Sequence, residues 1–232
     1  MGKDKLKRFR DNEAFENVFQ IPFEQLVNEG FPYKGKWREN VFKNDNPIVL
    51  ELGCGKGEYT VGLSRLYPNK NFIGVDVKGA RLWRGAKTLL DEERTNGAFL
   101  RTKIDQIERF FDKDEVDEIW ITFPDPQPRK SRAKKRLTSP VFLDRYRSFC
   151  KKDALVHLKT DSSLLYEYTC EVTDEEGLEV LQSTNDVYGK YIPQLTSDLE
   201  KQILSIKTTY EKIFGDQGFK INYHQFKLFK GE

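Results

Sequence analysis

The chain has few of the residues that mark extracellular, metal-binding or membrane proteins. Its 232 residues include only three cysteines and two histidines. The odd number of cysteines and their spacing fit neither a disulfide framework nor a metal site, so we expect no metal and a reducing cytoplasm. No apolar run is long enough to cross a membrane. The basic start at 3–8 has no apolar stretch behind it, so we expect no secretory signal.

A strong net charge is also absent. The formal net charge is only +2, although 33% of the residues are charged. Any binding of nucleic acid must therefore depend on local clusters of charge. A chain of this length can bury a sizeable core as one large domain. We expect residues 1–46, with scattered charges and aromatic side chains, to form a partly mobile N-terminal extension and residues 47–232 to form one domain.

The most informative stretch covers residues 48–57, Ile-Val-Leu-Glu-Leu-Gly-Cys-Gly-Lys-Gly. Its apolar start at 48–52 is typical of a buried strand, and an amphipathic helix follows from 58 to about 67. Strand, glycine turn and helix open a nucleotide-binding α/β domain. Gly53 and Gly55 let the backbone turn sharply and approach a ligand closely, because they lack a Cβ atom.

Glu51, two residues before the turn, helps to choose between ligands. The pyrophosphate of a dinucleotide is anionic and binds at a helix N-terminus, where an acid would repel it. The G-x-x-G spacing of dinucleotide sites is also missing, which argues against a nicotinamide-dependent oxidoreductase. Glu51 favours a cationic ligand instead. We interpret Cys54, between two of the glycines, as a small turn residue rather than a nucleophile.

Two further acids follow the next two predicted strands. Residues 71–76 form the second strand, and Asp76 at its end can accept hydrogen bonds from both hydroxyls of a ribose. A helix at 79–96 leads to a third strand at 98–104. Asp105 then either reaches an adenine amino group or caps a short helix, and the sequence leaves both alternatives open.

The fourth predicted strand, 116–123, runs into the loop Phe123-Pro-Asp-Pro-Gln-Pro128. Three prolines in five residues fix φ and prevent both helix and strand. Because ligands bind at the carboxyl ends of parallel strands, Asp125 is expected at the edge of a pocket. Six of the next eight residues, 129–136, are basic and can neutralise several phosphates of a nucleic acid. A nuclear-localisation signal is the rival interpretation of this run alone.

The remaining segments continue an alternation of helices and strands. We predict helices at 139–152 and 198–214, strands at 154–160, 178–182 and 219–229, and irregular structure at 185–197. Strands that alternate with helices indicate a mostly parallel sheet with helices on both faces. The tight return into the last strand allows one antiparallel member. We interpret His157, inside the fifth strand, as structural rather than catalytic.

With these motifs the chain resembles the bacterial tRNA (guanine-N7-)-methyltransferase family, over about residues 15–230. Two motifs are shared by S-adenosylmethionine-dependent methyltransferases: Leu50-Glu-Leu-Gly-Cys-Gly-Lys-Gly57 and Gly74-Val-Asp-Val77. Three together are specific to the family: Phe123-Pro-Asp-Pro126 with its basic tail, Leu158-Lys-Thr-Asp161 and Thr208-Thr-Tyr-Glu211. The resemblance implies a Rossmann-like class I methyltransferase fold, with a mostly parallel seven-stranded sheet, one antiparallel strand and helices on both faces.

The resemblance also implies roles for particular residues. Asp125 matches the acid treated as the active-site residue. The implied cofactor-binding residues are Glu51, Gly53, Gly55, Asp76 and Asp105. The implied substrate-binding residues are Arg129, Asp161, Thr208, Thr209, Tyr210 and Glu211. Arg129 stands where the family usually has lysine, and Gln127 stands where it usually has tryptophan.

The implied activity is methyl transfer from S-adenosylmethionine to N7 of a variable-loop guanine in tRNA, with S-adenosylhomocysteine as the product and no metal. We expect a monomer or homodimer without a membrane partner. Guanine N7 has an in-plane lone pair and no proton, so the enzyme mainly positions the reactants and stabilises charge. A non-catalytic RNA-binding module is the alternative. The acids Glu51, Asp76 and Asp125 argue against it, because a pure binder has no need for them.

Overall fold

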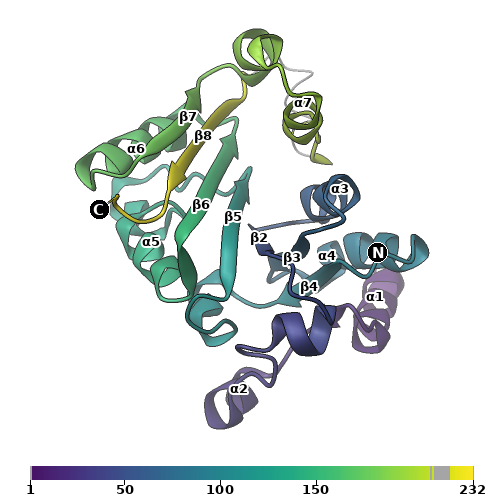
Figure 1. The fold of residues 1–232 in the computed structure, drawn as a ribbon. Helices are drawn as coiled ribbons and strands as arrows, with labels where there is room; N and C mark the ends of the chain where they lie inside the picture. Colours follow the sequence, from purple (N-terminus) through teal and green to yellow (C-terminus); the bar gives the residue numbers. More distant parts are fainter. Residues whose placement is uncertain (1, 210, 212–219, 232) are drawn as a thin grey trace.

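A computed structural model describes residues 2–209, 211 and 220–231 of the chain. It contains an eight-stranded sheet in the order β1-β4-β3-β2-β5-β6-β8-β7. The strands are β1 (Val18–Phe19), β2 (Ile48–Leu52), β3 (Asn71–Asp76), β4 (Gly97–Arg101), β5 (Val116–Thr122), β6 (Cys150–Thr160), β7 (Val180–Thr184) and β8 (Asn222–Lys227). Only β8 runs against its neighbours, β6 and β7 (Figure 1). This confirms the predicted mostly parallel sheet with one antiparallel strand.

The sheet has one strand more than the seven expected. β1 pairs with β4 in parallel, with Val18 opposite Phe99 and Phe19 opposite Leu100. It lies in the segment that the sequence assigned to the N-terminal extension. Two residues are too few to show any alternation of apolar and polar side chains, so no periodicity could have revealed this strand.

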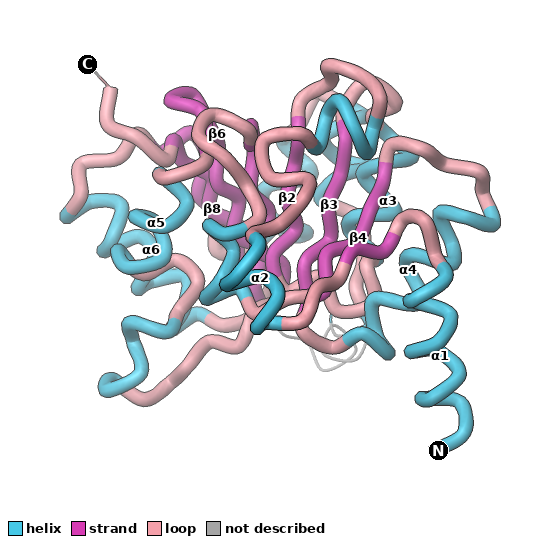
Figure 2. Tube along the Cα trace, turned by 90° about the horizontal axis from the view of Figure 1, so that it is seen from below, coloured by secondary structure: helices cyan, strands magenta, loops and turns pink. Residues whose placement is uncertain are grey.

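Helices cover both faces of the sheet, as predicted. The α-helices are α1 (Gly2–Ala14), α2 (Phe23–Glu29), α3 (Glu58–Leu66), α4 (Gly79–Asp91), α5 (Pro140–Arg147), α6 (Ser163–Glu175) and α7 (Asp198–Leu204). Shorter helical segments are η1 (Trp37–Phe42), η2 (Ile104–Arg109), η3 (Lys130–Lys135), η4 (Val187–Tyr191) and η5 (Ile192–Gln194). Figure 1 shows α5 and α6 on one side of the sheet and α3, α4 and α7 on the other. In Figure 2, α1 lies outside α4, at the end of the sheet that carries β4.

Side chains along β2 alternate between the two faces of the sheet and contribute to the apolar core on each face. Ile48, Leu50 and Leu52 are fully buried in the core that α5 and α6 cover. Val49 belongs to the core under α3 and α7. Because successive side chains of a strand point to opposite faces, Glu51 points with Val49 toward α3. A buried acid thus lies between the sheet and the helix that follows the glycine turn.

Two predicted boundaries are wrong around the fifth predicted strand. The helix expected at 139–152 ends at Arg147, and β6 begins at Cys150 rather than at 154. The carbonyl of Phe149 accepts hydrogen bonds from the amides of Glu115 and Val116, which begins the pairing of β5 with β6. The charged residues 151–153 concealed this extension, because they break the apolar pattern.

Other element ends differ from the expectation by a few residues. The helix expected at 79–96 ends at Asp91, and the left-handed Glu93, with φ 52°, follows it. Asn96 instead donates hydrogen bonds to the carbonyls of Ser64, Tyr67 and Lys70. Within the range 198–214 expected to be one helix, α7 ends at Leu204, and residues 210 and 212–219 lie outside the described residues.

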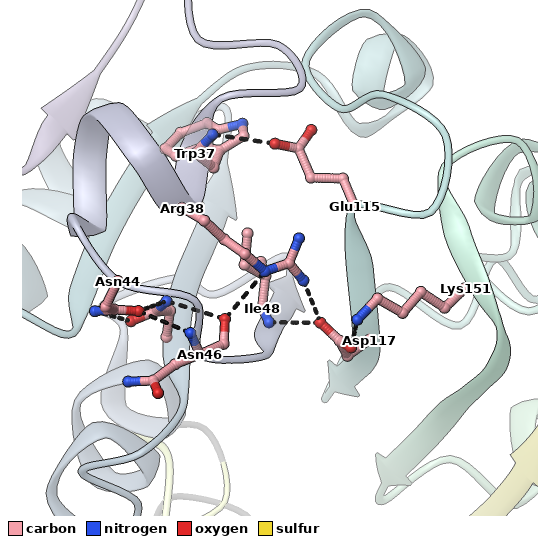
Figure 3. Close-up of polar contacts among 9 residues, drawn as sticks. Trp37, Arg38, Asn44, Asn46, Ile48, Glu115, Asp117 and Lys151 are labelled. Carbon is pink, nitrogen blue, oxygen red and sulfur yellow. Dashed lines mark hydrogen bonds and ion pairs between the residues drawn. The ribbon is translucent and has the colours of Figure 1, made fainter.

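A polar network at the amino end of β5 holds the segment before β2 (Figure 3). Asp117 accepts hydrogen bonds from the Ile48 amide at 2.8 Å and from Arg38 at 2.6 Å. The buried Glu115 accepts a hydrogen bond from the Trp37 amide at 3.1 Å. These two carboxylates therefore attach residues 37–48 to the edge of the sheet that lies opposite the glycine turn.

The residues before this network also contact the sheet and its helices. α1 lies against α4, where the Trp83 indole donates a hydrogen bond to Asp11 at 2.9 Å and Arg8 lies over the same ring. Within the described ranges, no helix combines the length and apolar character needed to cross a membrane. The division at residues 46 and 47 stays a prediction.

Trp37→Ala should show how much the packing of this segment contributes to stability. Trp37 is fully buried, its indole donates to the Phe110 carbonyl at 2.9 Å, and its ring stacks on Phe111. We expect the free energy of unfolding to fall by about 3–5 kcal/mol, measured by urea denaturation. Trp83→Ala is the matched control, because Trp83 is only half-buried and should cost less. If Trp37→Ala and Trp83→Ala lowered the free energy of unfolding equally, the packing of Trp37 would not have the special contribution assigned to it.

Candidate active site

The carboxyl ends of the parallel strands surround a cavity of about 940 Å³. This volume lies at the upper end of the range of about 300–1,000 Å³ for small-molecule sites, so a cofactor and a second group can share it. The predicted site residues that line it are Gly53, Gly55, Asp76, Asp105, Asp125, Asp161, Thr208 and Thr209. Most of the predicted site therefore comes together in one place.

Acidic side chains reach the cavity from five successive connections. Asp76 is the last residue of β3, and Glu58, Asp105, Asp125 and Asp161 come after β2, β4, β5 and β6, respectively. They converge because the carboxyl ends of parallel strands meet at one edge of the sheet. Each of these carboxylates can accept hydrogen bonds from a ligand in the cavity.

The glycine turn leaves its backbone open to this cavity. Gly53 and Gly55 have φ values of 76° and 58°, a region that glycine adopts at no steric cost. A Cβ atom at either position would meet no other protein atom within 4 Å, so a side chain would project into open space. At Gly57, by contrast, a Cβ atom would lie 2.5 Å from Phe99. The first two glycines therefore admit a ligand, and the third allows packing.

Asp76 shapes the turn and still has capacity for a ligand. One carboxylate oxygen, Oδ2, accepts the Gly55 amide at 2.9 Å, and Oδ1 accepts the Lys78 amide at 2.7 Å. A carboxylate has about four lone-pair positions, so each oxygen can accept one further hydrogen bond. Two ribose hydroxyls match this capacity. The open glycines, this acid and the cavity volume together fit S-adenosylmethionine.

Glu51 lies behind the turn and does not itself line the cavity. It is only 3% exposed. Its Oε2 accepts the amide of Thr60 at 2.8 Å and the hydroxyl at 2.6 Å, and its Oε1 accepts the Thr122 hydroxyl at 2.7 Å. Burial raises its pKa to about 7, although these hydrogen bonds act in the opposite direction. Because Thr122 lines the cavity, the charge of Glu51 lies one side chain behind its wall.

Asp105 is exposed and lines the cavity. The short helix η2 begins at Ile104, and its N-cap position belongs to Lys103. The alternative that Asp105 caps this helix is therefore wrong, and its carboxylate is available to a ligand.

The proline loop after β5 presents Asp125 to the cavity. Phe123 and Gln127 adopt left-handed backbones, with φ values of 48° and 45°. The Asp125 carboxylate accepts the Gln127 amide at 3.0 Å. The Arg136 guanidinium donates to the carbonyls of Pro126 and Gln127, both at 3.2 Å. Proline, local hydrogen bonds and one arginine thus give the loop a defined shape, with Asp125 exposed.

The basic segment 129–136 lies beside this loop and contains η3. Its exposed basic residues are Arg129, Lys130, Arg132, Lys134 and Lys135. Arg136 differs, since it is buried and lies 4.3 Å over the Tyr168 ring. One of the six basic residues is therefore structural. Lys135 lines the cavity, whereas Arg129 lies outside its described lining.

The residues Thr208 and Thr209 form part of the cavity wall. The amide and hydroxyl of Thr209 donate to Glu58 at 3.1 and 2.5 Å. Lys56 donates to the same hydroxyl at 3.0 Å. These contacts join this wall to the first turn of α3, directly after the glycine turn.

Glu211 does not join the other predicted site residues. It is 2% exposed, and its carboxylate lies 3.1 Å from the Lys159 ammonium. Tyr210, another predicted site residue, lies outside the described residues. Only the threonines of the motif Thr208-Thr-Tyr-Glu211 therefore reach the cavity in the described structure.

His157 and Cys54, which the sequence analysis interpreted as non-catalytic, have surroundings that fit a structural role. His157 stacks on Trp120 with ring centroids 4.1 Å apart, and its Nδ1 lies 2.7 Å from the Tyr223 hydroxyl. Burial, with nearby acids, raises the pKa of the Cys54 thiol, which keeps it neutral. Both observations support the interpretations made from the sequence.

Sequence reasoning missed the cations and the apolar wall of the cavity. The basic lining residues outside η3 are Lys56, Lys78, Arg81 and Lys103, and the apolar ones include Leu137 and Phe142. Single charges in loops have no pattern that separates a cavity from solvent. Lys159 did carry a signal, since a lysine in an apolar strand must find partners when buried.

Comparisons with known proteins agree with this geometry. A family model described as "Putative methyltransferase" matches residues 45–216. The tRNA (guanine-N(7)-)-methyltransferase of Christiangramia forsetii is 52% identical over 228 residues, which cover 98% of this chain and 99% of the relative. The enzyme of the same name from Bacteroides fragilis is 51% identical, covering 98% and 87%.

A solved structure shows the same fold at much lower identity. The 16S rRNA methyltransferase KamB superposes with a TM-score of 0.59 and 14% identity, covering 82% of this chain and 91% of that one. Among the described residues, no group of three or more histidines, cysteines or acids could hold a metal ion. The relatives that are more than half identical over nearly the whole chain show that it belongs to the tRNA (guanine-N(7)-)-methyltransferase family, as its motifs predicted.

Proposed function

We propose that the chain transfers a methyl group from S-adenosylmethionine to N7 of a guanine in tRNA, giving 7-methylguanosine and S-adenosylhomocysteine. One observation carries this proposal: the glycine turn with Asp76 and the proline loop with Asp125 line the same cavity. The names of the relatives support it. We further propose a variable-loop guanine as the target, a cytoplasmic enzyme without metal, and a monomer or homodimer.

The residues at the glycine turn would hold the cofactor. When bound, S-adenosylmethionine supplies an electrophilic methyl group on a positively charged sulfonium. Asp76 accepts hydrogen bonds from the ribose hydroxyls, and Asp105 accepts one from the adenine amino group. Gly53 and Gly55 let the amino-acid end approach the backbone, and the charge of Glu51 attracts its ammonium group.

The proline loop and the following strand end would hold the guanine. N7 needs no general base, because its lone pair is free to form the new bond to carbon. The purine gains positive charge as this bond forms. Asp125 stabilises that charge and accepts hydrogen bonds from the guanine N1–H and amino groups, while Asp161 helps to orient the base. Thr208 and Thr209 close the opposite wall.

The basic segment 129–136 would hold the RNA backbone while the base enters. In folded RNA, N7 lies in a deep groove or in a tertiary pair, so the guanine has to be displaced to reach the cavity. The exposed basic residues of η3 and Arg129 stand beside the proline loop that carries Asp125. They can therefore neutralise phosphates next to the displaced nucleotide.

Methyl transfer to unmodified bulk tRNA, followed by nucleoside analysis, tests the proposal. We expect 7-methylguanosine with the wild-type enzyme. Asp125→Ala should lower kcat by about 100-fold or more, because a lost charge-stabilising group costs roughly 2.7–4 kcal/mol, while the Kd for tRNA stays near the wild-type value. Asp153→Asn, at an exposed acid of β6, is the control and should keep full activity.

Three results would contradict parts of this proposal. Methylation of another atom would refute the assigned reaction. Tight tRNA binding without any transfer would favour the RNA-binding module. Unchanged turnover in Asp125→Ala would remove Asp125 from the mechanism and leave the cofactor assignment intact.

The pKa of Glu51, raised to about 7 by burial, makes cofactor binding sensitive to pH. The ammonium of S-adenosylhomocysteine favours the ionised acid, so binding releases a proton whenever the free enzyme holds Glu51 protonated. We expect the affinity to rise from about pH 6 to pH 7 and to level off near pH 8. Glu51→Gln should remove this dependence and weaken binding at pH 8 by about tenfold or more, measured by calorimetry.

A second buried acid provides the control for this measurement. Glu115 is buried at the amino end of β5, away from the cavity. Glu115→Gln should keep both the affinity and its pH dependence. If Glu51→Gln retained the wild-type pH profile, Glu51 would have no electrostatic role at the cofactor.

Substitutions in the basic segment should separate RNA contacts from structural contacts. Lys130→Ala with Lys134→Ala removes two exposed charges and should weaken tRNA binding. The slope of log K against log salt should fall by about 1.4, measured by filter binding between about 50 and 200 mM salt. Arg136→Ala should instead lower the melting temperature and leave the slope unchanged, because Arg136 is buried against Tyr168. An unchanged slope in the lysine variant would exclude both lysines as phosphate contacts.

A further inference from the structure

A buried lysine in β6 has no part in the proposed chemistry and yet lies close to the site. Lys159 is 0% exposed and comes two residues before Asp161, which lines the cavity. An ammonium group in the interior is costly unless all its donors find partners. Its partners therefore indicate what the residue holds in place.

The hydrogen-bond acceptors around Lys159 belong to segments that follow β7, while the rings of Tyr59 and Phe123 also face its ammonium group. Its Nζ donates to the carbonyls of Leu204 and Ile206 at 2.7 and 3.2 Å, and to the Glu211 carboxylate at 3.1 Å. The Tyr188 hydroxyl lies at 3.3 Å as a fourth acceptor, so every donor of the ammonium group has a partner. The lysine thus binds both ends of the short stretch that contains Thr208 and Thr209.

The charges around Lys159 are balanced within this cluster. The hydroxyl of Tyr188, in η4, donates to the other carboxylate oxygen of Glu211. Burial lowers the pKa of Lys159 to about 8, while Glu211 acts to raise it. The lysine therefore keeps most of its charge at neutral pH.

The same stretch is attached to α3 on its other side. Thr209 donates to Glu58, as described above. Ile206 packs on the helix where Gly62 leaves room, since a Cβ atom at Gly62 would lie 2.8 Å from the Ile206 side chain. Residues 204–209 are therefore held between β6 and α3, and they cross the cavity wall between these two attachments.

We propose that Lys159 is a positioning residue for the RNA substrate: it holds residues 204–209 so that Thr208 and Thr209 form the wall against which the target base is placed. The role of this wall rests on the proposed function. Lys159 itself touches no reacting group and acts through the carbonyls of Leu204 and Ile206. Glu211 then serves as the counter-charge of Lys159 rather than as a substrate contact.

The test uses a variant that removes both buried charges. Lys159→Met alone would leave the buried Glu211 carboxylate without a counter-charge and is strongly destabilising. Lys159→Met with Glu211→Gln leaves no charge buried, yet still lacks the donors to Leu204 and Ile206. The control is Lys227→Met with Glu179→Gln, which removes an exposed ion pair of 2.7 Å at the far side of the sheet.

Two measurements are made on both double variants in the full-length enzyme. Hydrogen–deuterium exchange of peptides covering residues 204–209 should become faster only in the Lys159 variant. In the methyl-transfer assay, KM for tRNA should rise about tenfold or more, because a displaced wall misplaces the base. The Kd for S-adenosylhomocysteine should change by less than about twofold, since the residues at the glycine turn are unaltered, and kcat should change less than KM.

Each outcome decides the proposal. Unchanged exchange in residues 204–209 would show that Lys159 does not hold the segment. Faster exchange with an unchanged KM would show that the segment does not position the substrate. An equal loss of cofactor and tRNA binding would indicate general unfolding and would also overturn it. If the wild-type enzyme methylates no tRNA, the proposed function fails, and the exchange data still decide whether Lys159 holds this stretch.

Discussion

The cavity depends first on a buried carboxylate that joins three elements. Glu51 of β2 bonds to Thr60 of α3 and Thr122 of β5. A buried carboxylate is costly unless hydrogen bonds compensate its burial, so loss of the Thr60 or Thr122 contacts would leave one of its oxygens unsatisfied in the interior. The glycine turn begins two residues after Glu51. The shape of the turn and the position of the negative charge behind it are therefore determined by the same residue.

A buried charge of opposite sign organises the other wall. Lys159 lies at the carboxyl end of β6, as Glu51 does in β2, and it attaches the stretch before Glu211. The two arrangements meet where Thr209 bonds to Glu58 in the first turn of α3. The stretch that contains Thr209 is thus joined to the start of α3 by hydrogen bonds to Glu58 and from Lys56.

The fold and most of the acids were predictable because their signals are local. Strand periodicity and strand-end acids indicated β2 to β6, Asp76 and Asp125 without knowledge of distant contacts. The two-residue β1 had no such signal, since its pairing with β4 is purely tertiary. The burial of Glu211 depends on Lys159, 52 residues earlier in the chain. Arg136 likewise looked like its basic neighbours, because only the packing on Tyr168 distinguishes it.

The contrast between buried and exposed acids bears on catalysis. The cofactor is positively charged before the reaction, so an acid behind the glycine turn contributes mainly to binding. Only interactions that strengthen as charge moves to the purine accelerate the chemical step. In the proposed mechanism Asp125 is suited to this task, because prolines and Arg136 hold its loop in place before a base would arrive. A group that is already oriented spends no reorganisation energy when the charge develops. In the proposed mechanism, the stiffness of the loop therefore matters as much as the carboxylate that it carries.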